Sequence, residues 1–254
     1  ACFRKVLKEM PSPPAEAHVG LAQSLLDLQQ FPQAEVCLQE ALRRHPDRII
    51  LQQLLGDTLK RSGRLEQAEQ HYRQILQQHP DHPPTLLNLA NLLAARGRLQ
   101  EALQHYQALL VGHPDDPELR YNLGTALNQA GKPREALPHL QFAASRRPDH
   151  APTHNNLGSA LADLQQLDDA VAAFEHAVRL DAAFLEARDN LVNSRLKLAD
   201  WRDVPKFRQR LVEPALRAGP AQPPLRPFAM LGLPVAISSA EQQRLIRAYA
   251  ARET

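Results

Sequence analysis

Cysteine, glycine, aromatic residues and strand-forming residues are all scarce in this sequence. Its 254 residues include 2 Cys, 10 Gly and 1 Trp, and only 5% are aromatic. Cys2 and Cys37 cannot form a disulfide framework, and nothing about them indicates zinc, so we expect a reducing, cytoplasmic location. Val, Ile and Thr together number 20 against 42 Leu, which argues against a sheet-rich fold and predicts an all-α chain.

An excess of one charge sign and long apolar runs are lacking too. The formal net charge is +2, with Lys and Arg spread along the chain, so the footprint of a nucleic-acid-binding protein is absent. No run approaches the roughly 18 to 20 consecutive apolar residues of a membrane span. We therefore expect neither nucleic acid nor a membrane as a partner. Residues 1–7 lack a secretory signal pattern and are typical of the interior of a helix, which indicates a piece of a longer protein.

Proline, by contrast, is abundant, with 21 residues. A helical protein must place so many helix breakers with care. Pro46, Pro80, Pro114 and Pro148 recur at a spacing of 34 residues, which is typical of a helical repeat array. The chain can therefore be divided into blocks of 34 residues that start at 15, 49, 83, 117 and 151. Each position within a block is called a column below.

Several columns carry the same kind of residue in every block. Columns seven and eleven are always Leu, and column twenty is always Ala. Column eight is always small: Ala22, Gly56, Ala90, Gly124 and Gly158. Column twenty-four is always large and apolar: Leu38, Tyr72, Tyr106, Leu140 and Phe174. Leucines four positions apart share one face of a helix, and small residues let a second helix approach closely, so each block predicts two packed helices.

This pattern resembles the tetratricopeptide repeat, a helix-turn-helix unit of 34 residues. The resemblance implies an all-α, right-handed α-solenoid, a superhelix with a concave groove. It covers residues 15–184 as five repeats: 15–48, 49–82, 83–116, 117–150 and 151–184. The last of these departs from the pattern, with Asp181 in the proline column and Gln165 in the glycine column of the turn. We expect residues 1–14 to be the second helix of a truncated preceding repeat and residues 185–218 to be a diverged closing repeat.

The 11 histidines do not form a catalytic or metal-binding pattern. His45, His79 and His113 are one repeat apart, and so are His71, His105 and His139, which places them too far apart to share an ion. We interpret them as surface residues copied with the repeat. A glycine-rich phosphate loop, a nucleophile elbow and a zinc protease motif are all missing. We therefore expect no catalytic residue, no metal ligand and no cofactor in this chain.

Binding is the function that remains, and two columns of the first helix carry it. Column six holds Asn in four consecutive blocks: Asn88, Asn122, Asn156 and Asn190. Asn is unfavourable inside a helix, and its amide can both donate to and accept from the backbone of an extended peptide. Column nine adds small polar residues that suit a groove wall: Asn91, Thr125, Ser159 and Asn193. These eight residues are the predicted peptide-binding groove, but column-six Asn is also common in tetratricopeptide repeats, where it can simply orient the neighbouring helix.

The end of the chain carries a second resemblance. Asp200-Trp201 is followed by a Pro-rich connector over 219–237, which contains Pro227-Phe228 and Leu231, and by a capped helix over 238–254. This order resembles that of O-GlcNAc transferase and Spindly-type glycosyltransferases, in which a tetratricopeptide array leads into the catalytic region. The resemblance implies that the groove asparagines contact the backbone of protein substrates, while the catalytic region is absent from this chain.

Two functions therefore remain open for this chain. It is either the substrate-recruiting region of such a glycosyltransferase or a general tetratricopeptide adaptor or assembly scaffold. Protein or extended peptide segments are the expected partners in both cases. A truncated first repeat would also expose apolar surface around Phe3 and Leu7, which would allow self-association.

Overall fold

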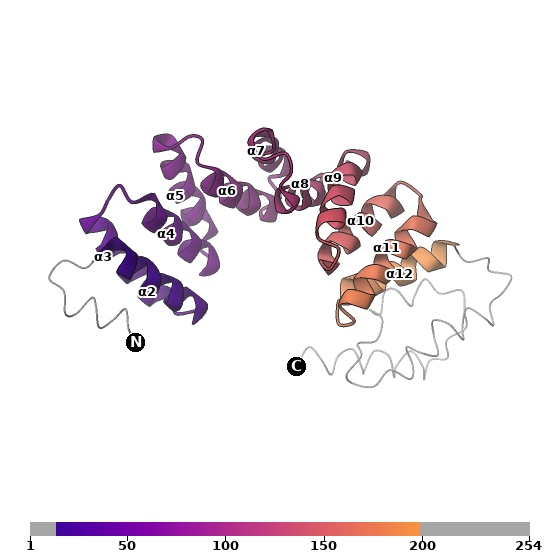
Figure 1. Ribbon diagram of the computed structural model, residues 1–254, viewed down its shortest axis with the longest axis horizontal. Coiled ribbons are helices and arrows are strands. Elements are labelled where there is room, and N and C mark those ends of the chain that lie inside the picture. Colours follow the sequence, from indigo (N-terminus) through magenta and orange to yellow (C-terminus); the bar gives the residue numbers. More distant parts are fainter. Residues whose placement is uncertain (1–13, 199–254) are drawn as a thin grey trace. The chain divides into compact units, whose positions relative to one another are not determined.

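The computed structural model describes residues 14–198. The predictions for residues 1–13, for 199–218, for the connector over 219–237 and for the helix over 238–254 concern residues outside this part. Within it the chain forms eleven α-helices and no strand, which confirms the all-α prediction (Figure 1). The helices are α2 (Ala15–Asp27), α3 (Phe31–Arg44), α4 (Ile49–Arg61), α5 (Leu65–Gln78), α6 (Pro83–Ala95), α7 (Leu99–Gly112), α8 (Pro117–Gln129), α9 (Pro133–Arg146), α10 (Ala151–Asp163), α11 (Leu167–Leu180) and α12 (Leu185–Leu198).

Several prolines that the 34-residue spacing leaves unassigned lie in the first turns of helices. The helices α3, α6, α8, α9 and α10 each have Pro at the first or second position. A helix tolerates proline there because the N–H that proline lacks has no partner within the helix in any case. Pro138 is different, since it lies inside α9. In the described helices, prolines therefore lie mainly in the first turn.

The turn within each helix pair requires a left-handed backbone at column fifteen. Gly63, Gly97 and Gly131 take φ values of 81°, 76° and 71° there. The same column holds Gln29 and Gln165 in the first and fifth blocks, with φ of 56° and 62°. The departure of Gln165 from the repeat pattern therefore changes the residue but not the turn. A residue with a Cβ in this conformation costs about 1 to 2 kcal/mol, which the surrounding packing must offset.

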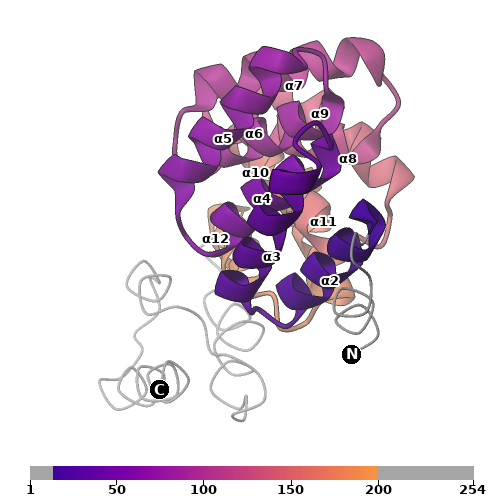
Figure 2. The same ribbon diagram turned by 90° about the vertical axis from the view of Figure 1, so that its left-hand side faces the viewer.

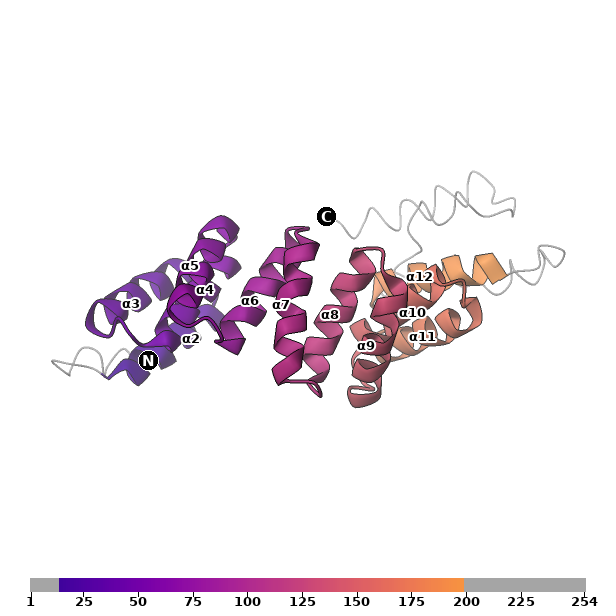
Figure 3. The same ribbon diagram turned by 90° about the horizontal axis from the view of Figure 1, so that it is seen from above.

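The described helices divide into two compact units, one ending at Pro114 and one beginning at Asp115. In the first unit, α2 packs on α3, α4 on α5 and α6 on α7, and the first helices α2, α4 and α6 also contact each other in turn. The second unit repeats this order, with α8 on α9, α10 on α11 and α12 against both α10 and α11. The view from above in Figure 3 shows the antiparallel course of α6 and α7, and Figure 2 shows α2 beside α3. In each unit the first helices therefore form a layer of their own.

Columns eight, twenty and twenty-four form the core of each repeat, as the sequence predicts. All five column-twenty alanines are fully buried, and the five column-twenty-four side chains are at most 2% exposed. The fit between columns eight and twenty-four is tight, because a Cβ added at Gly124 would come within 2.7 Å of Leu140, and one added at Gly158 within 2.7 Å of Phe174. The large side chains thus pack directly on the backbone of the first helix.

Ion pairs between repeats of the first unit were not predicted from the columns. Arg64 donates to both carboxylate oxygens of Glu35 in the preceding repeat, at 3.1 and 2.6 Å. Glu69, which is 8% exposed, accepts hydrogen bonds from Arg96 and Arg98 of the following repeat. A bidentate arginine fixes geometry as well as contributing energy. These contacts set how α3 and α5 sit beside the turns of the next helix pairs.

None of the described helices has both the length and the apolar composition that crossing a lipid bilayer requires.

Candidate peptide-binding surface

The eight residues of the predicted groove all lie on first helices. Asn88 and Asn91 are on α6 in the first unit, and the other six are on α8, α10 and α12 in the second unit. Seven of the eight are half-buried, and Asn193 is exposed. Within the second unit, the structure brings Asn156 to Thr125 and Asn190 to the repeat that contains Ser159. Columns six and nine of neighbouring repeats thus lie together, as a shared surface requires.

The column-six asparagines use their amide N–H groups within the protein. Three of the four donate to the first helix of the preceding repeat: Asn88 to Asp57 Oδ1 at 3.1 Å, Asn156 to Thr125 Oγ1 at 2.8 Å, and Asn190 to Asn155 Oδ1 at 3.0 Å. Asn122 has no side-chain hydrogen bond within the described part of its own unit. Because each amide nitrogen carries two N–H groups, one N–H of each of these three residues joins neighbouring repeats, and the contact of the amides with a peptide stays a prediction.

Column nine is also tied into the fold. The Tyr106 hydroxyl donates to Asn91 Oδ1 at 2.6 Å. The hydroxyls of Thr125 and Ser159 donate to backbone carbonyls one turn earlier in their own helices, at 2.8 and 3.1 Å. Asn193 alone of the four is exposed. This column therefore offers small polar side chains to a ligand, with Asn91 Oδ1 and Thr125 Oγ1 already accepting hydrogen bonds within the protein.

A cavity that the sequence analysis missed lies on the same columns in the first unit. It has a volume of about 440 Å³ and lies between α2 and α4. Its lining comes from columns nine, twelve and thirteen of the first block and columns six, nine, twelve and thirteen of the second: Gln23, Leu26, Asp27, Leu54, Asp57, Lys60 and Arg61. Column six is Leu54 here rather than Asn, so the asparagine pattern gave no signal. The name groove cavity is used for it below.

Opposite charges alternate along the wall of the groove cavity. Asp57 Oδ1 accepts from the Tyr72 hydroxyl at 2.6 Å and lies 3.6 Å from Lys60 Nζ. Burial, together with the charge of Asp57, raises the pKa of Tyr72 far above its usual range, so this hydroxyl remains a donor. Arg61 donates to the backbone carbonyl of Leu26 at 2.8 Å. The cavity thus combines two carboxylates, of which Asp57 is held by hydrogen bonds, and two cations.

Such a lining matches the chemistry of a peptide backbone. Carboxylates accept from peptide N–H groups, and ammonium or guanidinium groups donate to peptide carbonyls. The exposed Asp27 and the second oxygen of Asp57 provide the acceptors, while Lys60 provides a donor. Leu26 and Leu54 add apolar surface for one side chain of the ligand. The arrangement suits binding and contains no nucleophile paired with a base.

None of the six histidines interpreted as surface residues copied with the repeat is buried, but two histidines outside that set are. His18 and His154 are 2% and 7% exposed. The Nε2 atom of His154 lies 2.9 Å from the Pro148 carbonyl and so donates to it, which leaves Nδ1 to accept from His176 Nδ1 at 3.3 Å. His154 and His176 are 22 residues apart in the sequence, and the packing of α11 on α10 brings their rings together. No short sequence motif predicts this contact. Among the described residues no three His, Cys, Asp or Glu side chains form a metal-binding group.

Acid should destabilise the described helices because burial lowers the pKa of six histidines. These are His18, His82, His105, His139, His150 and His154. Between their lowered pKa values and the ordinary value of about 6.5, the unfolded chain binds more protons than the folded chain, so the free energy of unfolding rises with pH. We expect the thermal midpoint to be lower at about pH 5.5 than at about pH 7.5, at matched ionic strength. An equal or higher midpoint at the acid pH would contradict this reading of the histidines.

The antiparallel helix pairs and the layer of first helices define a helical-repeat interaction scaffold. Sequence comparison gives the family: models of the tetratricopeptide repeat match residues 19–83 and 121–183, and a second such model matches residues 59–127. The chain belongs to the tetratricopeptide repeat family, whose repeats are non-catalytic protein-interaction modules. No curated protein sequence matches the chain.

Solved structures confirm the α-solenoid fold class. The chain is similar to the solved part of MamA from Desulfovibrio magneticus RS-1, from residue 41 to its end, with 22% identity, a TM-score of 0.59 and coverage of 66% of this chain and 94% of that chain. It is similar to YrrB, a tetratricopeptide protein with an unusual peptide-binding site, with 19% identity, a TM-score of 0.58 and coverage of 74% and 96%. A third is TTC0263, a thermophilic tetratricopeptide protein from Thermus thermophilus, with 18% identity, a TM-score of 0.56 and coverage of 72% and 100%.

Proposed function

We propose that this chain is a scaffold that binds an extended segment of a partner protein on the first-helix layer of its repeats. The groove cavity carries this proposal. It lies on columns six and nine, the two columns that the sequence analysis selected in other repeats on separate grounds. Its mixture of acceptors, donors and apolar surface suits a main chain with one buried side chain. The likeness to YrrB, a protein with a peptide-binding site, supports the same class of ligand.

The asparagines of column six have two roles in this proposal. In Asn88, Asn156 and Asn190 one amide N–H holds neighbouring first helices in register, and the rest of the amide contacts the peptide. Asn190 Oδ1 has no partner among the described residues, whereas Asn88 Oδ1 accepts from Lys60 Nζ and Asn156 Oδ1 accepts from Asn155 Nδ2, both at 3.4 Å. Changing all four asparagines to Ala would therefore weaken both the fold and the ligand contacts. A sharper test uses exposed positions that carry no contact between repeats.

Gln23 and Gln70 provide a matched pair for this test. Both side chains are exposed on helices, but Gln23 lines the groove cavity in column nine, whereas Gln70 lies in column twenty-two of α5. A peptide is first selected from a displayed random library against the complete chain. We expect Gln23→Arg to weaken its binding by about tenfold or more, equal to about 1.4 kcal/mol, through bulk and charge in the cavity. We expect Gln70→Arg to leave the affinity unchanged.

Calorimetric titration measures the affinity of the selected peptide for both variants, and circular dichroism checks that both keep their helicity. Equal affinities for the Gln23→Arg and Gln70→Arg variants would contradict binding at the groove cavity. Failure to select any peptide from the library would contradict the ligand class itself.

We further propose that the natural ligands are protein substrates of an O-GlcNAc transferase-like glycosyltransferase. The support for this is the order of Asp200-Trp201 and Pro227-Phe228, which lie outside the described residues. The alternative, a general adaptor or assembly scaffold, fits the described helices equally well. The reading frame after codon 254 discriminates between the two. A following α/β pattern with a nucleotide-sugar site supports the transferase, and a frame without one supports the adaptor.

A further inference from the structure

Two of the four charged side chains that line the groove cavity balance each other. Asp57 and Lys60 lie one turn apart on α4, with Lys60 Nζ 3.6 Å from Asp57 Oδ1. The same ammonium group donates to Asn88 Oδ1 at 3.4 Å, and Asn88 Nδ2 donates to Asp57 Oδ1 at 3.1 Å. These contacts join α4 to α6, and they leave this part of the cavity wall without net charge.

The other two charged side chains differ, because Arg61 has partners and Asp27 has none among the described residues. Arg61 donates to the backbone carbonyl of Leu26 at 2.8 Å, and its guanidinium carbon lies 5.7 Å from the centre of the Phe31 ring. Asp27 is exposed and lines the same cavity, but its carboxylate makes no hydrogen bond or ion pair with any residue that the structure describes. Among the described lining residues, one charge is thus unpaired, and it is negative.

The position of Asp27 within its helix is unfavourable for a negative charge. Asp27 is the last residue of α2, and the final turn of this helix contains no basic residue. The peptide dipoles make the C-terminal end of a helix negative, so a cation is favourable there and an anion is not. The end of α4 follows this rule, with Lys60 and Arg61 in its last turn. Arg61 also reaches the end of α2, but it bonds the Leu26 carbonyl and leaves the Asp27 carboxylate unpaired.

We propose that the segment bound in the groove cavity carries a Lys or Arg residue that pairs with Asp27, beside an apolar residue that packs on Leu26 and Leu54. This inference rests on the proposed function and names the class of partner, a basic segment. Leu26 and Leu54 are buried and line the same cavity. An acidic segment would have to displace the contacts of Lys60 and Arg61, whereas a basic segment pairs with a carboxylate that is already available.

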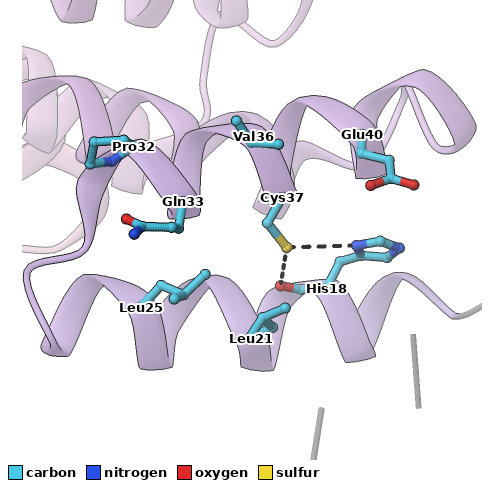
Figure 4. A pocket seen from close by; sticks show the side chains of 8 residues that line it. All are labelled: His18, Leu21, Leu25, Pro32, Gln33, Val36, Cys37 and Glu40. Atoms are coloured by element: carbon cyan, nitrogen blue, oxygen red, sulfur yellow. Dashed lines mark hydrogen bonds between the residues drawn. The ribbon is translucent and has the colours of Figure 1, made fainter. Parts of the chain in front are cut away.

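Another cavity of the first unit offers no unpaired carboxylate. It lies between α2 and α3, has a volume of about 490 Å³ and is lined mainly by apolar side chains (Figure 4). The carboxylate in its lining belongs to Glu40, which pairs with Arg44 one turn later on α3 at 3.1 Å. Glu40 and Asp27 are both exposed carboxylates of the same unit. Glu40 is therefore the matched control for an effect of net charge alone.

The test uses the complete chain and the peptides selected from the displayed library. We expect these peptides to be enriched in Lys or Arg at one position beside an apolar residue. For one such peptide, calorimetric titration should show that Asp27→Lys weakens binding by about tenfold or more, and that Glu40→Lys changes it by less than about twofold. Replacing the basic residue of the peptide by Glu should weaken binding to the parent chain and restore binding to the Asp27→Lys variant. Added salt should reduce these differences, because ions screen exposed charges.

Selected peptides without enriched Lys or Arg, or enriched instead in Asp or Glu, would overturn the proposal and leave binding at the groove cavity intact. Equal effects of Asp27→Lys and Glu40→Lys would overturn it too, because net charge and not the cavity would then set the preference. Failure of the proposed function has a different signature, since the affinity would then not respond to Gln23→Arg. The restored binding of the Glu-containing peptide also shows that the Asp27→Lys variant is folded.

Discussion

Phe174→Ala is expected to lower the free energy of unfolding of the second unit by about 3 to 5 kcal/mol. The ring is 1% exposed on α11, and it packs on Gly158 of α10 with no room for an added Cβ. Val171 and Leu157 pack against the same cluster, which also contains Leu161. Removing the ring leaves a cavity that these neighbours can fill only in part. A loss of this size is a large share of the roughly 5 to 15 kcal/mol that stabilises a typical domain.

Urea unfolding followed by circular dichroism measures this loss, and Val111→Ala is the control. Val111 is 86% exposed on α7, so removal of its two methyl groups should change the free energy of unfolding by less than about 0.5 kcal/mol. A loss below about 1 kcal/mol in the Phe174→Ala variant would show that column twenty-four does not join the helices of the repeat.

Gly56→Ala is expected to destabilise the first unit by about 1 to 3 kcal/mol, although Ala is the better helix former. A Cβ at this position would overlap the Tyr72 ring. The ring cannot move aside easily, because it is fully buried and its hydroxyl donates to Asp57 at 2.6 Å. Ala stands in the same column opposite Leu38 in the first repeat and opposite Tyr106 in the third, so the cost in the second repeat is the shift that Tyr72 must make away from the backbone of Gly56.

The control for this substitution is Gly112→Ala in α7. An added Cβ there meets nothing within 4 Å, so the variant should be as stable as the parent or up to about 1 kcal/mol more stable. Thermal or urea unfolding separates the two cases. If Gly56→Ala were as harmless as Gly112→Ala, the small residues of column eight would reflect helix preference alone and not close packing.

The fold was predictable because each repeat is specified by neighbours along one or two helices. Column twenty shows this best: Ala34 and Ala170 belong to different units, yet both are fully buried. Spacing along the chain determines which residues share a helix face, and the repeat multiplies that signal. The turn at Gln165 shows that the repeat also determines backbone conformation, because this residue departs from the glycine of the pattern and still adopts the left-handed conformation.

The site was predictable only in part, because a recurring residue shows that a position is used but not what it contacts. Asn88 and Asp57 are 31 residues apart, and only the stacking of repeats makes the amide of Asn88 a link to the preceding helix. The groove cavity was missed because Leu54 occupies column six there.

The central claim is that the first-helix layer, at the groove cavity, binds an extended peptide. Photo-crosslinking tests it most directly, with a photoreactive residue placed at position 23 or at position 70 of the complete chain and the selected peptide added at saturation. Both positions are exposed, but only position 23 lines the cavity. We predict that the peptide is captured from position 23 and not from position 70. Capture from position 70 alone, or equally from both, would contradict the claim.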